Sequence, residues 1–519
     1  MGFDFSSFGN DNLSESFVEW LVDEQSVDVG IHFGRFWDYY HNQMYGTGSG
    51  SSGASGKSNE SSRSYVQGQE VGLPARITGV SYASGVSANG GNATDDIQRK
   101  EVVIENDITW RINAMVDFLF GKEVSFVSKS PDGQRRREIG NILKAVFEAN
   151  GDTGFFQNMA VLGSVYGFVD CMVRPSEEVL FSFDDTKTMR GSNNTFSSSQ
   201  LPSFESILQL ASTIGLELIE APRALPVLDE NDYRKIDHYV QHFYQQKNEI
   251  SMEGGFLNNL LKSNSAGGKR DRDVVTEIIG AEWWQRYENK KLVSEGVNPL
   301  GVVPIVHIQN IAQPYYYEGI SDVEQLIGLQ DELNTRLSDR ASRITFQAFK
   351  MYLAKGLEGV DERSISPGRM WCTDNPDASI EPFGGDSAMP SENMHISEIR
   401  EAMDKVSGVT PVVAGVLKNK LGNLTSGVAL RMTFMGMLAK TVRKQYTYGT
   451  GLKQIARLVL RTLDVCRIYP TTAEEREIEI IFPDPLPENM AEKLKEAQIK
   501  KELGVSQQQV LRELGYEEV

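Results

Sequence analysis

The sequence predicts an α+β protein with several domains, and three observations support this fold class. The chain has 519 residues, of which 40% are apolar, and this is enough for roughly three well-packed domains. Strand-like segments rich in β-branched and aromatic residues concentrate between residues 235 and 310. Long helical patterns dominate after residue 320. We therefore expect a mixed body in the first 310 residues and a largely helical part after it.

The charge of the chain argues against a protein that grips nucleic acid strongly. Lys and Arg total 52 against 71 Asp and Glu, a net charge of −19, so no strongly basic surface is available for counterion release. Cys171, Cys372 and Cys466 lie far apart, which favours a reducing compartment and argues against a disulfide framework or a thiolate metal site. The sequence has no run of about 18 apolar residues and no basic region at its start, so we expect neither a membrane span nor a signal peptide.

The first 121 residues predict two helices separated by a polar stretch. An amphipathic helix is expected near residues 14–24, followed by the aromatic segment RFWDYYHNQMYG. Residues 46–64 are a Gly/Ser stretch that cannot bury enough apolar surface to fold by itself, and we expect a flexible loop or arm there. A second helix is expected over residues 102–120, closed by Gly121.

Between residues 122 and 310 the sequence predicts one helix and several strands. The segment EVSFVS indicates a strand, and a helix near residues 154–163 leads into a strand in VYGFVDCMV. Three further segments have strand character, namely KIDHYVQHFYQQ, DVVTEIIGAEWWQRYENKKLV and GVVPIVHIQN.

Two helices bracket a small α/β excursion in the second half. Residues 321–346 are expected to form a long helix of roughly 39 Å with a capping box of Ser321 and Glu324. Beside its apolar stripe lies a basic side made by three arginines at helical spacing, Arg336, Arg340 and Arg343. The excursion covers residues 347–389, and the next helix covers 391–406.

The C-terminal part begins with a loop over residues 408–425. From Ser426 a helical pattern continues to about Cys466, and glycines are expected to kink or interrupt it at three positions, Gly436, Gly449 and Gly451. The segment EIEIIFPDPLP indicates a strand. The tail from Glu488 predicts two helices, the second with a capping box of Ser506 and Gln509.

No local motif predicts a catalytic residue, a cofactor or a metal site. The segment GASGKS lacks the first glycine of a phosphate-binding loop and lacks the strand before it and the helix after it. His238 and His242 are four residues apart but lie in a predicted strand without the Glu of H-E-x-x-H, so we interpret them as strand residues. A catalytic pair of carboxylates that the fold brings together stays an open alternative.

The junction at residues 418–427 has two interpretations. Lys418 and Lys420 precede a helix start at Thr425 or Ser426, and the unpaired N–H groups of a first helical turn favour anions. The alternative is a polar loop, an ordinary N-cap and a buried apolar stripe, made by Val428, Met432, Met435 and Leu438.

The order of the segments resembles the portal proteins of tailed bacteriophages, the siphophage-type family, from about Leu13 to the end. The resemblance rests on seven segments in the family's order: YYHNQMYG, ITWRINAMVDFLFGKEVSF, GSVYGFVDCMV, NPLGVVPIVHIQN with EGISDVEQLIGLQDELNTRLSD, TSGVALRMTFMGML, FPDPLPEN and GVSQQQVLRELGY. It implies a multi-domain portal fold that assembles as a ring with a central channel. The implied parts are a wing (1–317, with the 46–64 arm), a stem helix (318–346), a clip (347–390), a second stem helix (391–407), a tunnel loop (408–425), the long helix and strand of the wing (426–486), and a crown (487–519).

The resemblance implies a non-enzymatic protein of the virion, located at the portal vertex of the capsid and assembled in the cytoplasm of a bacterial host. The implied partners are other copies of the chain in a dodecameric ring, and double-stranded DNA held weakly and without sequence specificity. The further implied partners are the terminase large subunit, the major capsid and scaffold proteins, and a head–tail adaptor. A membrane, a cofactor and a metal are not implied.

The tunnel loop carries the residues expected to contact DNA, which are Lys418, Asn419, Lys420 and Asn423. Arg336, Arg340 and Arg343 could present a second basic band to the channel, or they could pair with acids of the neighbouring stem helix. Two alternatives come from other classes of protein. One is an enzyme acting on nucleic acid or nucleotide with an anion site at residues 418–427, and the other is a different virion connector or minor capsid protein.

Overall fold

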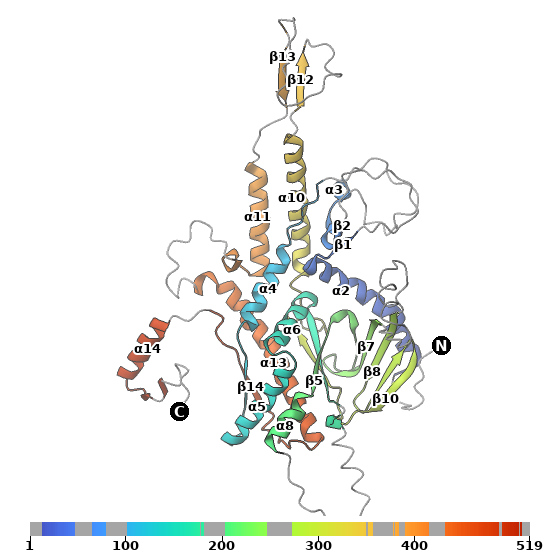
Figure 1. The fold of residues 1–519 in the computed structure, drawn as a ribbon, viewed down its shortest axis with the longest axis vertical. Coiled ribbons are helices and arrows are strands. Elements are labelled where there is room, and N and C mark those ends of the chain that lie inside the picture. The colour runs from blue at the N-terminus through green and yellow to red at the C-terminus, as the bar shows by residue number, and fades with distance from the viewer. Residues whose placement is uncertain are drawn as a thin grey trace, which may run out of the picture. The chain divides into compact units, whose positions relative to one another are not determined.

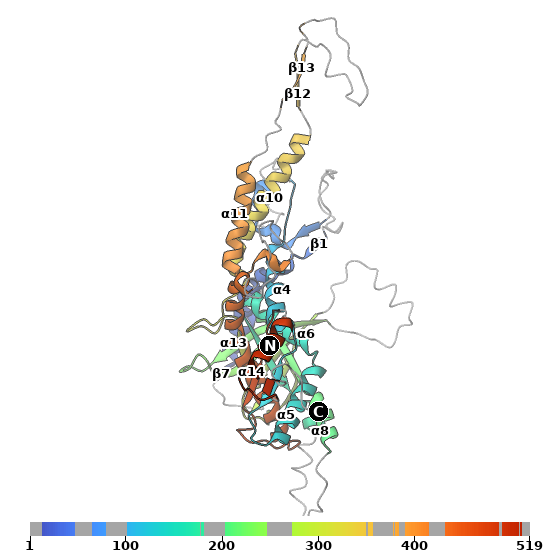
Figure 2. The ribbon, with the colours of Figure 1, turned by 90° about the vertical axis from the view of Figure 1, so that its left-hand side faces the viewer.

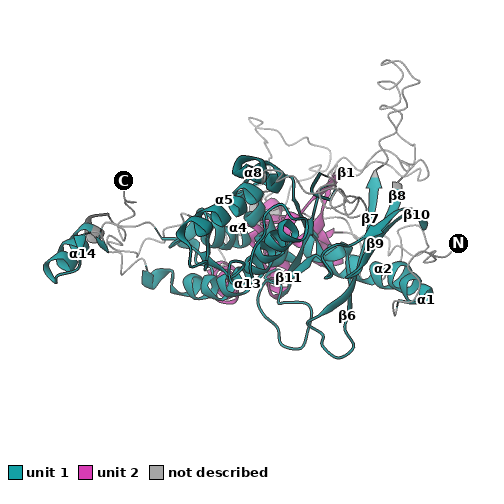
Figure 3. Cartoon of the chain, turned by 90° about the horizontal axis from the view of Figure 1, so that it is seen from below, with its two compact units in different colours: residues 1–37, 110–324, 408–519 teal, residues 38–109, 325–407 magenta. Residues whose placement is uncertain are grey.

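The computed structural model describes two compact units, which are coloured separately in Figure 3. Unit 1 comprises residues 1–37, 110–324 and 408–519, and unit 2 comprises residues 38–109 and 325–407. Strands and helices are both present, as expected for an α+β chain. The residues described are 13–46, 65–78, 101–176, 178–180, 203–246, 272–348, 351–355, 377, 379–383, 390–414, 431–486, 490–507 and 509–510.

The larger sheet of unit 1 has five antiparallel strands in the order β10-β9-β8-β7-β6. The strands are β6 (Ala224–Leu228), β7 (Ile236–Gln246), β8 (Arg272–Ile279), β9 (Trp283–Glu288) and β10 (Lys291–Val297). Burial alternates along β9, so Trp283 and Tyr287 face a core that also holds Val240 and Ile278. The predicted strands between residues 235 and 297 are confirmed, whereas β6 was not anticipated.

The N-terminal helix continues much further than the sequence indicated. Helix α1 (Glu15–Trp20), a π-helical turn (Leu21–Gln25) and α2 (Ser26–His41) follow one another directly. The prediction that the helix ends near residue 24 was wrong, because most of the aromatic segment belongs to α2. Two glycines in α2 weakened the helical signal, but its Phe33 ring packs edge-on against Tyr166 and Phe168 in unit 1.

A second sheet of unit 1 has the order β11-β4-β5, all antiparallel. Its strands are β4 (Phe168–Arg174), β5 (Gly215–Ile219) and β11 (Ile305–Gln309), and α6 (Thr153–Tyr166) packs beside β4. Gly167 joins α6 to β4 with φ +94°, and a Cβ atom there would clash with the Gly319 carbonyl group. The turn therefore requires glycine.

Helix α13 (Met435–Val465) is the longest described helix and packs along β11 and β14. Its predicted interruptions were wrong: the helix runs unbroken through Gly436, Gly449 and Gly451, and the irregular residue is Phe434, a turn between helical residues 431–433 and α13. A Cβ atom at Gly451 would clash with the side chain of Ile308 on β11. This glycine therefore permits a close approach of helix and strand and does not break the helix.

Shorter elements complete unit 1. Strand β14 (Ile478–Ile481) pairs with β3 (Ser125–Ser128), so both predicted strands are confirmed. Helix α14 (Met490–Glu502) lies in the tail, and Ser506 Oγ accepts a hydrogen bond of 3.3 Å from the Gln509 N–H, as the second capping box requires. Elements not anticipated are α5 (Gly133–Ala149), α8 (Phe204–Ser212), and the short turns Ala221–Arg223 and Pro411–Ala414.

In unit 2, α10 (Ile327–Ala348) and α11 (Pro390–Ser407) lie side by side (Figures 1 and 2). The predicted helix start at residue 321 was wrong, because a 3₁₀ turn (Glu324–Leu326) precedes α10, which begins at Ile327. The predicted capping hydrogen bond is present, since Ser321 Oγ accepts from the Glu324 N–H at 3.2 Å. Strands β12 (Met351–Lys355) and β13 (Ser379–Phe383) form an antiparallel hairpin between the two helices in sequence. The predicted helix–excursion–helix order is confirmed. Of the two segments of the excursion with strand character, AFKMYLA overlaps β12, and RMWCTD lies outside the described residues.

A buried polar ladder on α10 explains why the second predicted helix begins late. Helix α4 is Asp107–Phe120, whereas a start at residue 102 was expected. The extended segment before α4 hydrogen-bonds to three α10 side chains spaced four residues apart. Gln330 Nε2 donates to Glu105 O at 2.6 Å, Asn334 Oδ1 accepts from Glu105 N at 3.1 Å, and Ser338 Oγ accepts from Val103 N at 3.0 Å. These side chains satisfy the backbone in place of a helix.

The remaining elements of unit 2 pack against the same ladder. Strands β1 (Met44–Gly46) and β2 (Tyr65–Gln67) pair, and a 3₁₀ turn (Gly68–Gly72) and α3 (Ala75–Thr78) follow. Asn334 Nδ2 donates to the buried Gln69 Oε1 at 2.9 Å. No helix in the described part of the chain is long and apolar enough to cross a membrane.

Candidate functional site

The predicted DNA-contact residues Lys418, Asn419, Lys420 and Asn423 lie outside the described residues, which stop at 414 and resume at 431. The capping residues of the anion-site alternative, at 425 and 426, lie there as well. The site is therefore defined by the residues on both sides of this loop, all of which belong to unit 1.

Both ends of the loop are held by one apolar cluster. Val409, at the start of the predicted loop, and Phe434 and Met437 after it are buried together with three further residues, which are Ala114 and Met115 of α4 and Leu486 after β14. Arg111 of α4 donates to the Val409 carbonyl oxygen at 3.3 Å. The two ends of the loop therefore start from one fixed base on α4 and α13.

Two turns further along α13, a cluster of buried charges joins the helix to the segment before α10. Asp322 Oδ1 lies 2.7 Å from Lys440 Nζ, and Asp322 Oδ2 lies 2.6 Å from Lys444 Nζ. The Lys444 side chain is 1% exposed and the Asp322 side chain 8% exposed. We call these three residues, with Ser164 and Asn310, the Asp322 cluster.

Hydrogen bonds complete the Asp322 cluster. Lys444 Nζ donates to Ser164 Oγ at 2.7 Å, and Asn310 Nδ2 donates to Asp322 Oδ2 at 3.0 Å. Burial alone would raise the pKa of Asp322, but the positive charges of Lys444 and Lys440 outweigh it and hold that pKa well below its usual range. Burial also lowers the pKa of Lys444, although Asp322 opposes this effect. Removing the carboxylate would leave a buried positive charge without its partner.

Sequence patterns did not indicate this cluster. The only signal is that Lys444 falls on the buried face of α13, at helical spacing from Met437, Thr441, Tyr448 and Leu452. A lysine in such a stripe needs an acceptor. The acceptor, Asp322, is 122 residues away in sequence, and no spacing rule connects the two.

The three arginines of the basic side lie on α10 in unit 2. Arg343 forms an ion pair with Glu392 of α11, as the pairing alternative expects. Arg336 pairs with Glu332 of its own helix at 2.7 Å, and Arg340 Nη1 lies 3.4 Å from Asn393 Oδ1 of α11. All three residues are partly exposed.

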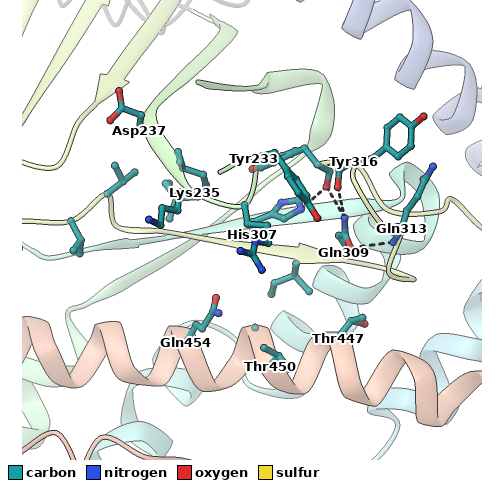
Figure 4. Close-up of a pocket in the computed structure, with 18 of the residues that line it drawn as sticks. Tyr233, Lys235, Asp237, His307, Gln309, Gln313, Tyr316, Thr447, Thr450 and Gln454 are labelled. Atoms are coloured by element: carbon teal, nitrogen blue, oxygen red, sulfur yellow. Dashed lines mark hydrogen bonds between the residues drawn. The ribbon is translucent and has the colours of Figure 1, made fainter. Parts of the chain in front are cut away.

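A hollow of about 640 Å³ opens in unit 1 between β11 and α13 (Figure 4). One of its lining residues, His307, forms a candidate catalytic pair with a carboxylate behind it, because His307 Nδ1 lies 2.7 Å from the buried Asp170 Oδ1. However, His307 Nε2 lies 2.7 Å from the Tyr317 carbonyl oxygen, which can only accept, so Nε2 carries a hydrogen and does not present a base to the hollow. Tyr239 and Tyr317 both donate to Asp170. We therefore interpret His307 and Asp170 as a structural hydrogen-bonded pair and not as a catalytic one.

The hydroxyl groups around Asp170 are strongly held in their neutral form. Burial, reinforced by the negative charge of Asp170, raises the pKa of Tyr239 and of Tyr317 well above the usual range.

His238 and His242 lie on β7, as interpreted from the sequence, and His242 Nδ1 lies 3.0 Å from Thr276 Oγ1. Among the described residues, no group of three His, Cys, Asp or Glu side chains could hold a metal ion.

Comparisons with known proteins match most of the chain to one family. Residues 112–517 match the family model described as phage portal protein, SPP1 Gp6-like. No curated protein matches the sequence. Similar solved chains come from a structure titled virion of native gene transfer agent (GTA) particle, with 12% identity, a TM-score of 0.40 and coverage of 79% of this chain and 90% of that chain. Another comes from the neck of an empty GTA particle computed with C6 symmetry, with 13% identity, a TM-score of 0.40, and coverage of 80% and 91%.

Proposed function

Because the chain belongs to the phage portal protein family, SPP1 Gp6-like, we propose that it forms a ring at one vertex of a capsid and provides the channel for DNA packaging and ejection. The family match over residues 112–517 carries this proposal, since it includes the long helices and the loop between them. In this function the protein is a structural component and not an enzyme.

The predicted tunnel loop at residues 408–425 is the proposed DNA-facing part. Its base on α4 and α13 supports this role, because a loop fixed at both ends can project side chains without losing its position. Lys418 and Lys420 would meet the phosphate backbone there, with Asn419 and Asn423 beside them. A net charge of −19 suits a channel through which DNA slides, because few contacts would hold the polyanion in place.

The α10–α11 pair with the β12–β13 hairpin is the proposed stem and clip. Two antiparallel helices joined through a hairpin would present the hairpin at one end of the ring, where the terminase motor docks first and a head–tail adaptor docks later. The partly exposed Arg336, Arg340 and Arg343 would give the stem part of the channel a weakly basic band. We propose the tail helix α14 as part of the crown.

Electron microscopy of the purified protein tests the assembly. We expect closed rings of about a dozen subunits with a central channel, and a stable monomer at micromolar concentration would contradict the proposal.

A charge reversal tests the role of the loop. The double variant Lys418→Glu/Lys420→Glu should assemble normally but package less DNA, because two repulsive charges would face the phosphates in each subunit. The matched control is Lys129→Glu/Lys291→Glu, which makes the same charge change at two exposed lysines outside the proposed loop and stem. Packaging that is equal in both double variants would remove the DNA-facing role from the loop.

A further inference from the structure

Helix α13 has an apolar stripe on its exposed side in addition to the buried one. Met435, Ala439, Val442 and Tyr446 are separated by four, three and four residues, so they share one face of the helix. Met435 is 67% exposed, Val442 63% and Tyr446 78%. The opposite face is buried against the body of unit 1. A helix that is apolar on both sides is normally covered on both sides.

Three tyrosines extend this stripe beyond the helix. Tyr233 and Tyr316 line the hollow of Figure 4, and Tyr446 is a further lining residue. The rings of Tyr233 and Tyr315 lie 6.4 Å apart. Tyr315 is 83% exposed and Tyr316 61% exposed. We call Met435, Val442, Tyr446, Tyr233, Tyr315 and Tyr316 together the α13 flank. Tyrosine is a residue that frequently provides the binding energy at protein interfaces.

The exposed area of the α13 flank is similar to the area that one partner contributes to a standard protein–protein interface. With roughly 150–250 Å² for each fully exposed side chain of this size, the exposed fractions of the six residues give roughly 600–1,000 Å². Each partner of a standard stable interface contributes about 800 Å². An apolar surface of this size on a soluble chain is normally an interaction site.

We propose that the α13 flank is the surface through which one copy of this chain binds the next copy in a ring. This inference rests on the proposed portal function, which requires such a contact but does not say where it lies. A ring needs a heterologous interface, in which two different patches of the subunit meet. Figure 3 shows α13 on one side of unit 1 and α5 and α8 on the other, so a copy seated on the α13 flank leaves a separate side for the next contact.

The test replaces two flank residues by charged ones in the full chain. Val442→Glu/Tyr446→Glu changes side chains that are exposed in a single subunit, so its circular dichroism spectrum should match the wild type. The control is Val293→Glu/Val297→Glu on β10, where the two valines are 56% and 69% exposed. Ring populations are measured by mass photometry and sedimentation velocity at micromolar concentration.

We expect at least a tenfold loss of rings in the flank variant and wild-type rings in the control. Rings at the wild-type level in the flank variant, or an equal loss in the control, would overturn the inference and leave the proposed function standing. A wild-type protein that stays a single chain would overturn both.

A photo-crosslinker tests independently, and without adding charge, whether the α13 flank contacts a neighbouring copy. With p-benzoylphenylalanine in place of Tyr446, irradiation of the assembled protein should join neighbouring copies in a ladder of covalent multimers. Mass spectrometry of the joined peptides would identify the receiving patch. Crosslinks confined to one chain would contradict the inference.

Discussion

The strongest single perturbation of the fold should be Asp322→Asn. The variant keeps the size of the side chain but leaves the ammonium groups of Lys440 and Lys444 without their shared carboxylate. Lys444 is 1% exposed and cannot turn to water, whereas Lys440, at 16%, lies nearer the surface. Breaking a buried pair by removing one partner typically costs 3–5 kcal/mol, and we expect about 3 kcal/mol here because Lys440 can become solvated.

The second single variant of a double-mutant cycle, Lys444→Met, should destabilise the fold less than Asp322→Asn. Lys444→Met removes the more deeply buried charge and leaves Asp322 paired with Lys440, so we expect a loss of about 1–2 kcal/mol. The double variant Asp322→Asn/Lys444→Met should be more stable than Asp322→Asn alone, because it no longer buries an unpaired ammonium group. This sign of the coupling distinguishes a charge effect from a general loss of packing.

Hydrogen–deuterium exchange of the α13 peptides around residues 440–452 is the suitable assay. A chain of 519 residues with two units need not unfold in one step, and exchange reports the opening of this helix itself. The folded-state pKa of Asp322 lies below that of the unfolded chain, so its contribution is present above about pH 4 and is lost only as the pH falls below it. The loss of opening free energy caused by Asp322→Asn should therefore be equal at pH 7 and pH 5. An opening free energy that changes by less than about 0.5 kcal/mol would refute the reasoning.

Three further predictions concern other parts of the fold. The hydrogen bond from Arg135 lowers the pKa of Glu475 to about 2, so Glu475→Gln should lower the melting temperature at pH 7, and the difference should close as the pH falls from about 4 to 2. Gly451→Ala should destabilise α13 by about 1–3 kcal/mol, measured by exchange, because the new methyl group meets Ile308; wild-type exchange would contradict this. Asn334→Ala should cost about 2–3 kcal/mol in the melting of unit 2, because it leaves buried partners in the ladder unsatisfied, and a neutral result would show that water replaces it.

The sequence predicted those elements whose signal is local. Strands β7 to β11 alternate or carry β-branched runs, and α11 repeats apolar residues on the buried face that holds Ile396, Ile399 and Met403, so periodicity was sufficient. The N-cap at Ser321 was also predicted from four residues alone. In each case the residues that decide the structure lie within a few positions of one another.

The errors arose where distant partners decide the local structure. Residues 102–106 have helical spacing but are extended, because side chains of α10 more than 220 positions later satisfy their backbone. The glycines of α13 look like breaks in sequence, yet Gly451 is required by β11. The Asp322 cluster was missed for the same reason, since its carboxylate and ammonium groups come from separate segments. Tertiary context overrides local propensity at all three places.

Helix α13 combines three features that separate experiments can distinguish. Its first turn fixes the base of the loop that we propose faces DNA, its buried face carries the Asp322 cluster, and its exposed face carries the α13 flank. A defect in the cluster should reduce the protection of the helix, and a defect in the flank should reduce ring formation while protection within the single chain is kept. A defect in the loop should leave both intact and reduce packaged DNA. If any one variant changed all three readouts equally, the helix would act as one rigid part, and the separate roles assigned to its faces would have to be abandoned.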